Sequence, residues 1–261
     1  MDNFHVNEVI GQGRYSTVYK GKKKDNFIKL YAIKRVDKSH KNTVLQEVKI
    51  LRSLDHANIL EYCGIGDLRT LLERDCKYPE DSVHDIARDL VSGLRYLHSK
   101  GIIHGDLKPS NILFDGNGYA KLCDFGLSRD LSDSLEEGEG NKRGSPCYMA
   151  PELFDDGGVH SYASDLWDLG CVLYECYAGR PPFIGTKFTE IVKSILTNPI
   201  PSLPGNPSPS FANLVSRLLI KDPKDRIQWS EICTHAFWGT QLISPVVLPP
   251  EPAFDNMILG D

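Results

Sequence analysis

The hydrophobic positions of this chain follow two different periods. Residues 4–37 alternate apolar and polar side chains, with glycines between the segments. Most of the later chain repeats its apolar residues every three or four positions. Alternation is typical of a half-buried strand, and the longer period is typical of a helix with one buried face. The pattern predicts an α+β protein with a small β-rich N-terminal part, built as a meander of short strands, and a larger helical C-terminal part.

Two amphipathic helices are predicted after the strands. The first covers residues 43–54, has Glu47 beside its apolar face, and is marked by Val44, Leu45, Val48, Leu51 and Leu54. The second begins near Ser82, and its apolar stripe consists of Val83, Ile86, Leu90, Leu94 and Leu97. Gly101 is placed to end this second helix, because glycine readily adopts the left-handed conformation of a helix C-terminus.

The rest of the pattern is a hairpin, further helices and a tail. Asp115-Gly116-Asn117-Gly118 is a strong turn signal between two short apolar segments and predicts a β-hairpin. After Pro151 the spacing is again helical, most clearly at Leu166, Leu169, Leu173 and Cys176. From Ser244 onward the prolines predict an extended tail.

Composition narrows the class of protein. With 261 residues and 41% hydrophobic content, the chain can bury one large core or two modest ones. A net charge of −5 predicts neither a nucleic-acid partner nor an anionic membrane partner. The seven cysteines lack metal-ligand spacing, which favours reduced thiols in the cytoplasm. The first residues lack the features of a secretory signal, and no apolar run approaches the ~20 residues that span a bilayer.

Four segments carry candidate chemistry, and the first is a glycine loop. Gly11 and Gly13 have no side chains, so a strand-turn-strand backbone can approach phosphate oxygens closely. The third small residue is Ser16, and Val18 follows as an apolar contact for a base. Taken alone, this segment favours an ordinary tight turn over a phosphate-binding loop.

The second segment ends in Lys34, which follows the apolar stretch Leu30 to Ile33. An unpaired ammonium would be costly there. Glu47, on the following helix, is the candidate counter-ion that holds Lys34 toward the α- and β-phosphates of a nucleotide. The alternative is a lysine whose stem packs on apolar surface while its amino group reaches solvent.

The third and fourth segments are His104-Gly105-Asp106-Leu107-Lys108-Pro109-Ser110-Asn111 and Asp124-Phe125-Gly126. Asp106 is the candidate base for a substrate hydroxyl, and Lys108 can neutralise the transferred phosphate. Asn111 and Asp124 supply oxygen ligands of the kind that Mg²⁺ prefers. Each segment alone could be an ordinary loop, but their spacing across a predicted hairpin favours one site.

These motifs, with Ala150-Pro151-Glu152 after them, resemble the eukaryotic protein kinases from about Phe4 to Trp238. The resemblance implies a bilobal kinase fold that uses ATP and Mg²⁺. It divides the chain into a kinase domain (4–238), with an N-lobe (4–60), a hinge (61–67) and a C-lobe (68–238), followed by a Pro-rich tail (239–261).

The resemblance also assigns roles to individual residues. It implies that Glu152 pairs with Arg226, and that Asp165 lies on a buried helix beneath the catalytic loop. The hinge residues Glu61 and Cys63 would bind adenine through their backbone. The full set of ATP contacts that it implies is Ile10, Gly11, Gly13, Ser16, Val18, Ala32, Lys34, Glu61, Cys63 and Leu113.

Lys108 and the substrate-loop residue Ser145 match the serine/threonine branch of the family. Several segments resemble the Fused/Unc-51-like group, especially its plant and protist Runkel-like members. That subgroup implies a serine/threonine protein kinase with protein substrates and a cytoskeletal, often microtubule-linked, role. A small-molecule phosphotransferase of the same fold fits less well, because the segment from Ser145 to Glu152 resembles a peptide-docking loop.

Two departures from the family pattern bear on activity. Gly105 stands where the family has an arginine that binds an activation-loop phosphate, so regulation by that route is not expected. Leu60 meets Glu61 directly, so about two strands are missing. The ends of an antiparallel hairpin lie ~5 Å apart, so the fold can close without it. The gap leaves open an alternative function as a catalytically impaired scaffold or nucleotide-binding interaction module.

Overall fold

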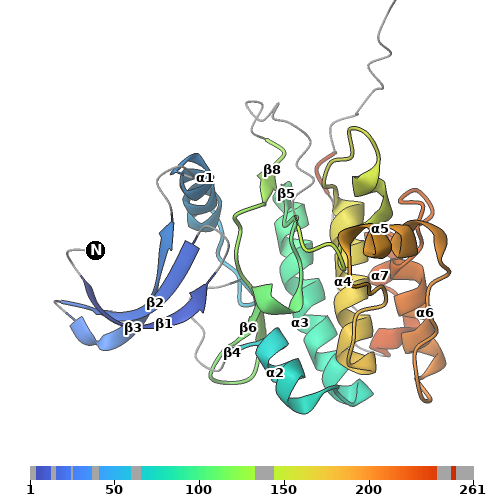
Figure 1. The fold of residues 1–261 in the computed structure, drawn as a ribbon, viewed down its shortest axis with the longest axis horizontal. Helices are drawn as coiled ribbons and strands as arrows, with labels where there is room; N and C mark the ends of the chain where they lie inside the picture. The colour runs from blue at the N-terminus through green and yellow to red at the C-terminus, as the bar shows by residue number, and fades with distance from the viewer. Residues whose placement is uncertain are drawn as a thin grey trace, which may run out of the picture.

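The structure is a computed structural model that describes residues 4–12, 16–24, 26–36, 41–59, 66–132, 144–239 and 248–250. Figure 1 shows a three-stranded sheet and one helix at one end of the molecule and a larger helical part at the other. The predicted division into a small β-rich part and a larger helical part is therefore confirmed.

The N-terminal sheet is an antiparallel meander. It consists of β1 (Phe4–Gln12), β2 (Ser16–Lys23) and β3 (Asn26–Val36), in the order β1-β2-β3. Val18 on β2 lies opposite Lys34 on β3, so the two side chains share a face of the sheet. No strand in the described part of the chain pairs with the outer edge of β1. The predicted gap after Leu60 lies outside the described residues.

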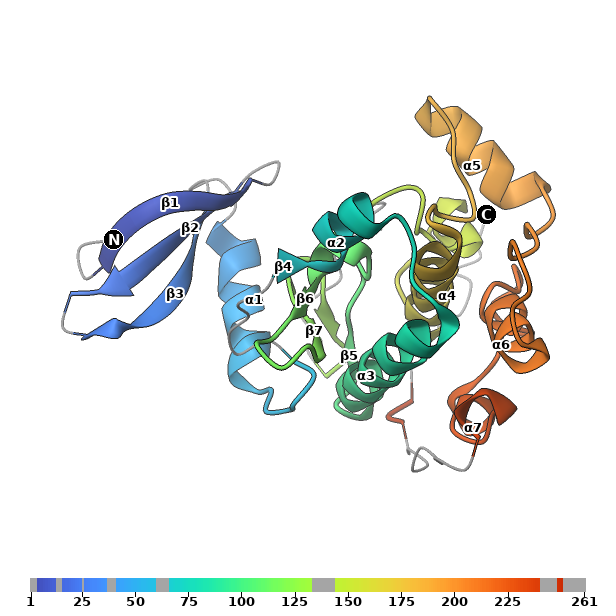
Figure 2. The same ribbon diagram turned by 90° about the horizontal axis from the view of Figure 1, so that it is seen from below.

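Figure 2 shows helix α1 (Lys41–Arg52) between this sheet and the rest of the molecule. It corresponds to the predicted helix at 43–54. Glu47 and Ile50 are buried, while Leu51 packs in part against the main core. The helix therefore places one carboxylate on the side of the sheet that faces the larger lobe.

Short strands connect the two parts. The strands β4 (Gly66–Asp67), β6 (Ile112–Phe114) and β7 (Ala120–Leu122) form one small sheet, and β5 (Ile102–Ile103) pairs with β8 (Arg129–Asp130). The predicted hairpin is the turn between β6 and β7. Asp115 accepts the N–H groups of Asn117 and Tyr119 through one carboxylate oxygen, which explains why this sequence turns here.

In the described residues, the larger lobe contains six helices: α2 (Leu68–Asp75), α3 (Glu80–Ser99), α4 (Tyr162–Ala178), α5 (Phe188–Thr197), α6 (Pro209–Leu218) and α7 (Trp229–Ile232). Short 3₁₀ turns lie at η2 (Pro109–Asn111), η3 (Pro151–Phe154) and η4 (Ala236–Trp238). The predicted stripe of α3 is buried along its length, and Gly101 follows the helix with φ +73°.

Helix α4 lies at the centre of this lobe, and all four apolar residues predicted for it are buried. Arg226 is buried as well and forms a bidentate ion pair with Glu152, at 2.7 and 2.9 Å. Its guanidinium also lies 5.2 Å from the ring centre of Trp167 on α4. The predicted Glu152–Arg226 pair is therefore confirmed.

Among the described residues, no helix is long and apolar enough to cross a membrane. Most of the predicted extended tail lies outside the described part of the chain. Its residues 248–250 are described and form neither helix nor strand, and the Tyr162 hydroxyl donates to the carbonyl of Pro249.

Candidate active site

The loop that carries Asp106 is held from below by a buried carboxylate. Asp165 on α4 is fully buried and accepts the backbone N–H groups of His104 and Gly105, at 2.8 and 2.9 Å. It also lies 2.8 Å from Nε2 of His98, whose Nδ1 accepts the indole N–H of Trp229. Burial favours the neutral acid, but these hydrogen bonds keep the pKa of Asp165 below its ordinary value. The predicted position of Asp165 beneath the loop is confirmed.

Above this support, three predicted residues form a compact polar group. Lys108 donates to Oδ2 of Asp106 at 2.5 Å. The side-chain amide of Asn111 donates to the carbonyl and to Oδ2 of Asp106, at 2.8 and 3.0 Å. Because the side-chain nitrogen of Asn111 donates these two hydrogen bonds, its side-chain oxygen is the amide atom that remains to bind a cation.

A second group combines two consecutive elements, β3 and α1, with Asp124, which lies 90 residues from Lys34 in the sequence. Nζ of Lys34 on β3 donates to both carboxylate oxygens of Glu47 on α1, at 2.9 and 3.1 Å. It also donates to Oδ1 of Asp124 at 2.6 Å. Burial, the largest single influence, lowers the pKa of Lys34, but the two carboxylates together raise it above its ordinary value. Lys34 therefore has anionic partners, and the interpretation of it as a surface lysine with a solvent-facing amino group is not supported.

The turn at Asp124 has backbone geometry that suits close approach. Asp124 has φ +61°, which is unusual for a residue with a side chain. A Cβ at Gly126 would lie 3.3 Å from Oδ1 of Asp124 and 4.0 Å from Nζ of Lys34. Phe125 is buried against His104, with ring centres 5.3 Å apart. The glycine leaves room for the ion pair, while the phenylalanine anchors the segment.

The two groups belong to one site. Burial favours the neutral form of Asp124, but the charges of Lys34, His104 and Lys108 keep the pKa of its carboxyl below the ordinary value. Lys108 is therefore close enough to Asp124 to influence its ionisation. At one end of the site, the ammonium of Lys34 lies with the carboxylates of Glu47 and Asp124. At the other end, the carboxylate of Asp106 lies with the ammonium of Lys108 and the amide of Asn111.

The structure describes only some of the residues that are predicted to contact the nucleotide. Gly11 lies opposite Val18 in the sheet, and Ser16 begins β2, while Ile10 on β1 is exposed. Leu113 on β6 is half-buried and pairs with Asp67. Gly13, Glu61 and Cys63 lie outside the described residues. The backbone of Ala32 pairs with Lys20, but its side chain also lies outside the described part.

Gly105 has a steric reason to be glycine. Its φ is +77°, and a Cβ would lie 2.8 Å from the carbonyl oxygen of Leu127. Sequence analysis noted only that the family arginine is absent here. The structure adds that the backbone at this position is left-handed and crowded.

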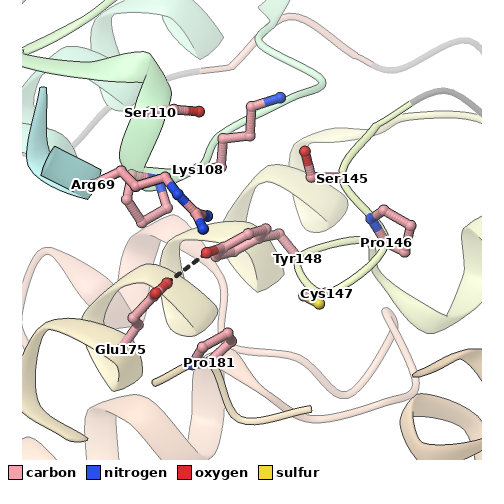
Figure 3. A pocket seen from close by; sticks show the side chains of 10 residues that line it. Arg69, Lys108, Ser110, Ser145, Pro146, Cys147, Tyr148, Glu175 and Pro181 are labelled. Carbon is pink, nitrogen blue, oxygen red and sulfur yellow. Dashed lines mark hydrogen bonds between the residues drawn. The ribbon is translucent and has the colours of Figure 1, made fainter. Parts of the chain in front are cut away.

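A pocket that no sequence motif predicted lies beside Lys108 and Ser145 (Figure 3). Its lining includes Arg69 on α2, Glu175 on α4 and Tyr148, whose hydroxyl donates to Glu175 at 2.6 Å. Tyr148 and Glu175 are 27 residues apart, so no local motif joins them. The local sequence offers one hint of this pocket: Tyr148 follows the predicted substrate-loop residue Ser145 by three positions.

A lysine paired with a helix glutamate, next to an Asp–Lys–Asn loop and an Asp-Phe-Gly turn, is the arrangement of a phosphotransferase with a kinase fold. The protein kinase domain model matches residues 4–238, and the chain belongs to this family. The expected bilobal kinase fold is therefore confirmed.

Curated relatives define the branch of the family. The chain is 59% identical to serine/threonine-protein kinase RUNKEL of Arabidopsis thaliana over 274 positions, which cover 99% of this chain and 20% of the relative. It is 38% identical to serine/threonine-protein kinase 36 of Mus musculus, covering 98% of this chain and 20% of the relative. It is 34% identical to fused of Drosophila melanogaster, covering 91% of this chain and 31% of the relative.

These similarities confirm the serine/threonine class and the resemblance to the Fused/Unc-51-like group, including RUNKEL. Members of this family use ATP together with a divalent metal ion and phosphorylate proteins. The chain spans about a fifth of the length of RUNKEL and of serine/threonine-protein kinase 36, at 20% of each. The alignment with RUNKEL has 274 positions, more than the 261 residues of this chain. Within the aligned region, RUNKEL therefore has residues without a counterpart here.

Proposed function

We propose that this chain transfers the γ-phosphoryl group of ATP to a serine or threonine hydroxyl of a protein. One observation carries the proposal. Nζ of Lys34 bonds both Glu47 and Asp124, in the same site as the Asp106–Lys108 pair. Asp124 lies 90 residues from Lys34 in the sequence. Their ion pair is partly exposed and would stabilise the protein only weakly, so stability alone gives little reason to bring these charges together.

The Lys34–Glu47 pair is assigned to the α- and β-phosphates of the nucleotide. Glu47 fixes the ammonium, so that little side-chain entropy is lost when a phosphate binds. The glycine loop at Gly11 and Gly13 is assigned to the phosphates through its backbone. The base is assigned to Ile10, Val18, Ala32 and Leu113 and to the hinge residues Glu61 and Cys63.

Asn111 and Asp124 are the residues that fit a magnesium ion. In the described part of the chain, no cluster of three or more His, Cys, Asp or Glu residues could hold a metal by itself. Mg²⁺ is ordinarily bound by one or two protein oxygens together with phosphates and water, and these two side chains offer that donor set. When bound, the ion would neutralise charge on the phosphates.

Asp106 and Lys108 are assigned to the transfer itself. Asp106 orients the substrate hydroxyl and accepts its proton. A bond forms between the hydroxyl oxygen and the γ-phosphorus, while the bond to the β–γ bridging oxygen breaks and ADP leaves with that electron pair. Lys108 stabilises the negative charge of the transferred group.

Transfer of radiolabelled phosphate from ATP to a protein substrate tests the proposal. Asp106→Asn is expected to reduce the rate by about 10²- to 10⁴-fold, the contribution of a positioned acid–base group. Asp81→Asn is the control, because Asp81 is exposed in the first turn of α3. Equal rates for the chain and Asp106→Asn would show that the activity is not its own.

A catalytically impaired scaffold is the second candidate. Two observations favour it: the N-terminal sheet has three strands in the described residues, and RUNKEL has residues that this chain lacks. Thermal melts with and without Mg·ATP separate the candidates in part. No shift at millimolar ATP supports the scaffold, because a ligand that binds the folded state raises the melting temperature.

The cytoskeletal role is a separate proposal whose support is the resemblance to the Runkel-like members alone. It predicts that the chain, or a longer protein that contains it, sediments with microtubules. Recovery of the protein only in the supernatant at microtubule concentrations that saturate a known binder would contradict it.

A further inference from the structure

The pocket beside Lys108 and Ser145, here called the hollow, lies directly beside the proposed catalytic loop. It has a volume of about 280 Å³, slightly below the about 300–1,000 Å³ of a typical small-molecule site. Its size suits one or two amino-acid side chains. Lys108 lines this hollow and also bonds Asp106. A peptide whose hydroxyl reaches Asp106 must therefore pass over the hollow.

The lining combines apolar walls with two opposite charges. Its apolar surface is provided by Pro109, Pro146, Cys147 and Pro181. The two opposite charges are those of Glu175 and Arg69, and both groups lie near the Tyr148 hydroxyl (Figure 3). The third charged residue, Lys108, is paired with Asp106 and points away from the hollow in the same view.

Glu175 is the recessed charge. It is half-buried on α4 and accepts a hydrogen bond from the Tyr148 hydroxyl at 2.6 Å. Burial raises the pKa of Glu175, and the Tyr148 hydrogen bond and the Arg69 charge oppose that rise only in part. If no cation of the protein lay near it, a carboxylate in this position would attract a basic side chain of a bound peptide.

Arg69 is the cation already present. Its Nε donates to Glu73 at 3.0 Å on the same helix, and its side chain is 56% exposed. Figure 3 shows its guanidinium group beside the Tyr148 hydroxyl, at the end of the Tyr148–Glu175 hydrogen bond. Burial lowers the pKa of Arg69, but the hydrogen bond to Glu73 and the charges of Glu73 and Glu175 raise it above its ordinary value. Arg69 and Glu175 therefore interact electrostatically within one hollow.

We propose that Arg69 occupies the part of the hollow next to Glu175. Its charge thereby prevents a basic side chain of a bound peptide from binding in this subsite. The chain then selects protein substrates with a neutral or acidic residue at the position that meets the hollow. Like-charge repulsion from Arg69 disfavours an incoming arginine or lysine, and the proline walls accept an uncharged side chain. The inference rests on the proposed function only in taking the bound peptide as the substrate.

A peptide scan with two readouts tests this inference. Arginine replaces alanine at each position from four before to four after a single serine, in an otherwise uncharged peptide. Binding of the labelled peptides is followed by fluorescence anisotropy, and phosphate transfer to them is measured separately. The proteins compared are the chain, Arg69→Ala, Arg69→Lys, the double variant Arg69→Ala/Glu175→Gln, and Arg74→Ala. Arg74 is the matched control, because it lies on the same helix but does not line the hollow.

In the original chain, Arg69→Lys and Arg74→Ala, arginine is expected to improve binding at no position. In Arg69→Ala, one position is expected to gain about tenfold on arginine substitution, which corresponds to about 1.4 kcal/mol. The double variant is expected to lose that gain. The same arginine profile in the chain and in Arg69→Ala, or an arginine preference in the original chain, overturns the inference.

The two readouts separate this inference from the proposed function. If the binding profile switches as expected but no phosphate is transferred, the subsite stands and the kinase activity fails. If transfer occurs and depends on Asp106, but the arginine profile is unchanged by Arg69→Ala, the subsite proposal fails and the activity stands.

Discussion

The two halves of the candidate site are held in place by different means. The half that carries Asp106 rests on Asp165, which is fully buried and accepts two backbone N–H groups of the loop. The half that carries Lys34 is held by side-chain ion pairs, and the side chains of Lys34 and Asp124 are 31% and 44% exposed. One half is fixed by the core of the larger lobe, and the other by contacts across the two lobes.

This difference separates stability from nucleotide binding. Buried hydrogen bonds to a charged group are costly to break, because the partners cannot turn to water. Ion pairs of half-exposed groups contribute little to stability, since solvent screens them. Changes beneath the catalytic loop should therefore unfold the chain, while changes at Lys34 should impair its chemistry and leave it folded. The gap predicted after Leu60, if present, would affect the second half and not the first.

The largest effect on stability is expected at the buried support. Asp165→Ala leaves the N–H groups of His104 and Gly105 without their acceptor, and should lower the free energy of unfolding by about 3–5 kcal/mol. Urea denaturation measures this change. Asp81→Asn, at an exposed helix position, should change stability by only about 0.5 kcal/mol. A loss below about 1 kcal/mol for Asp165→Ala would break the proposed distinction between the halves.

At the other half, Lys34→Met should reduce phosphate transfer by about 10²- to 10³-fold, the effect of removing one preorganised electrostatic group. Its free energy of unfolding should fall by about 1–2 kcal/mol, less than for Asp165→Ala, because Glu47 is buried but Lys34 and Asp124 are partly exposed. Rate measurements and urea denaturation on the same preparation check both statements. Lys20→Met, at an exposed lysine that pairs with Glu8 on the outer strand, should retain the original rate.

A smaller, pH-dependent effect is expected at Asp168, which is buried on α4 and has one carboxylate oxygen without a hydrogen-bond partner among the described residues. Burial, together with the charges of Asp165 and Asp106, raises the pKa of Asp168 well above its ordinary value. As pH rises above about 4, the unfolded chain releases this proton while the folded chain retains it. Asp168 should therefore cost about 1.4 kcal/mol of stability per pH unit, up to its folded pKa.

Asp168→Asn removes this titration and nearly preserves the shape of the side chain. The variant should be more stable than the original chain at neutral pH, and its advantage should grow with pH across that interval. Thermal melts between pH 4 and pH 8 measure the difference. A constant difference across that range would show that Asp168 titrates normally.

Much of this architecture could be read from the sequence, because periodicity reports burial and motif spacing reports chemistry. The stripe of α3 and the hairpin at Asp115 are local patterns, and both are confirmed. The pairing of Lys34 with Glu47 followed from the cost of leaving a lysine unpaired at the end of an apolar strand.

What the sequence could not predict depends on tertiary packing. The hollow between Arg69 and Glu175 is formed by segments more than 100 residues apart, with no shared motif. The left-handed backbone of Gly105 and the buried carboxyl of Asp168 follow from the docking of the loop on α4. The two-residue strands β4, β5 and β8 are too short to show a period.

The most direct test of the account is the Mg²⁺ dependence of ATP binding, measured by isothermal titration calorimetry. The account predicts that Mg²⁺ strengthens ATP binding to the original chain and that Asp124→Asn loses this strengthening while remaining folded. It also predicts that Lys34→Met weakens ATP binding whether or not Mg²⁺ is present. If ATP binds equally well to all three proteins with and without Mg²⁺, or binds to none of them, these residues do not form a nucleotide site.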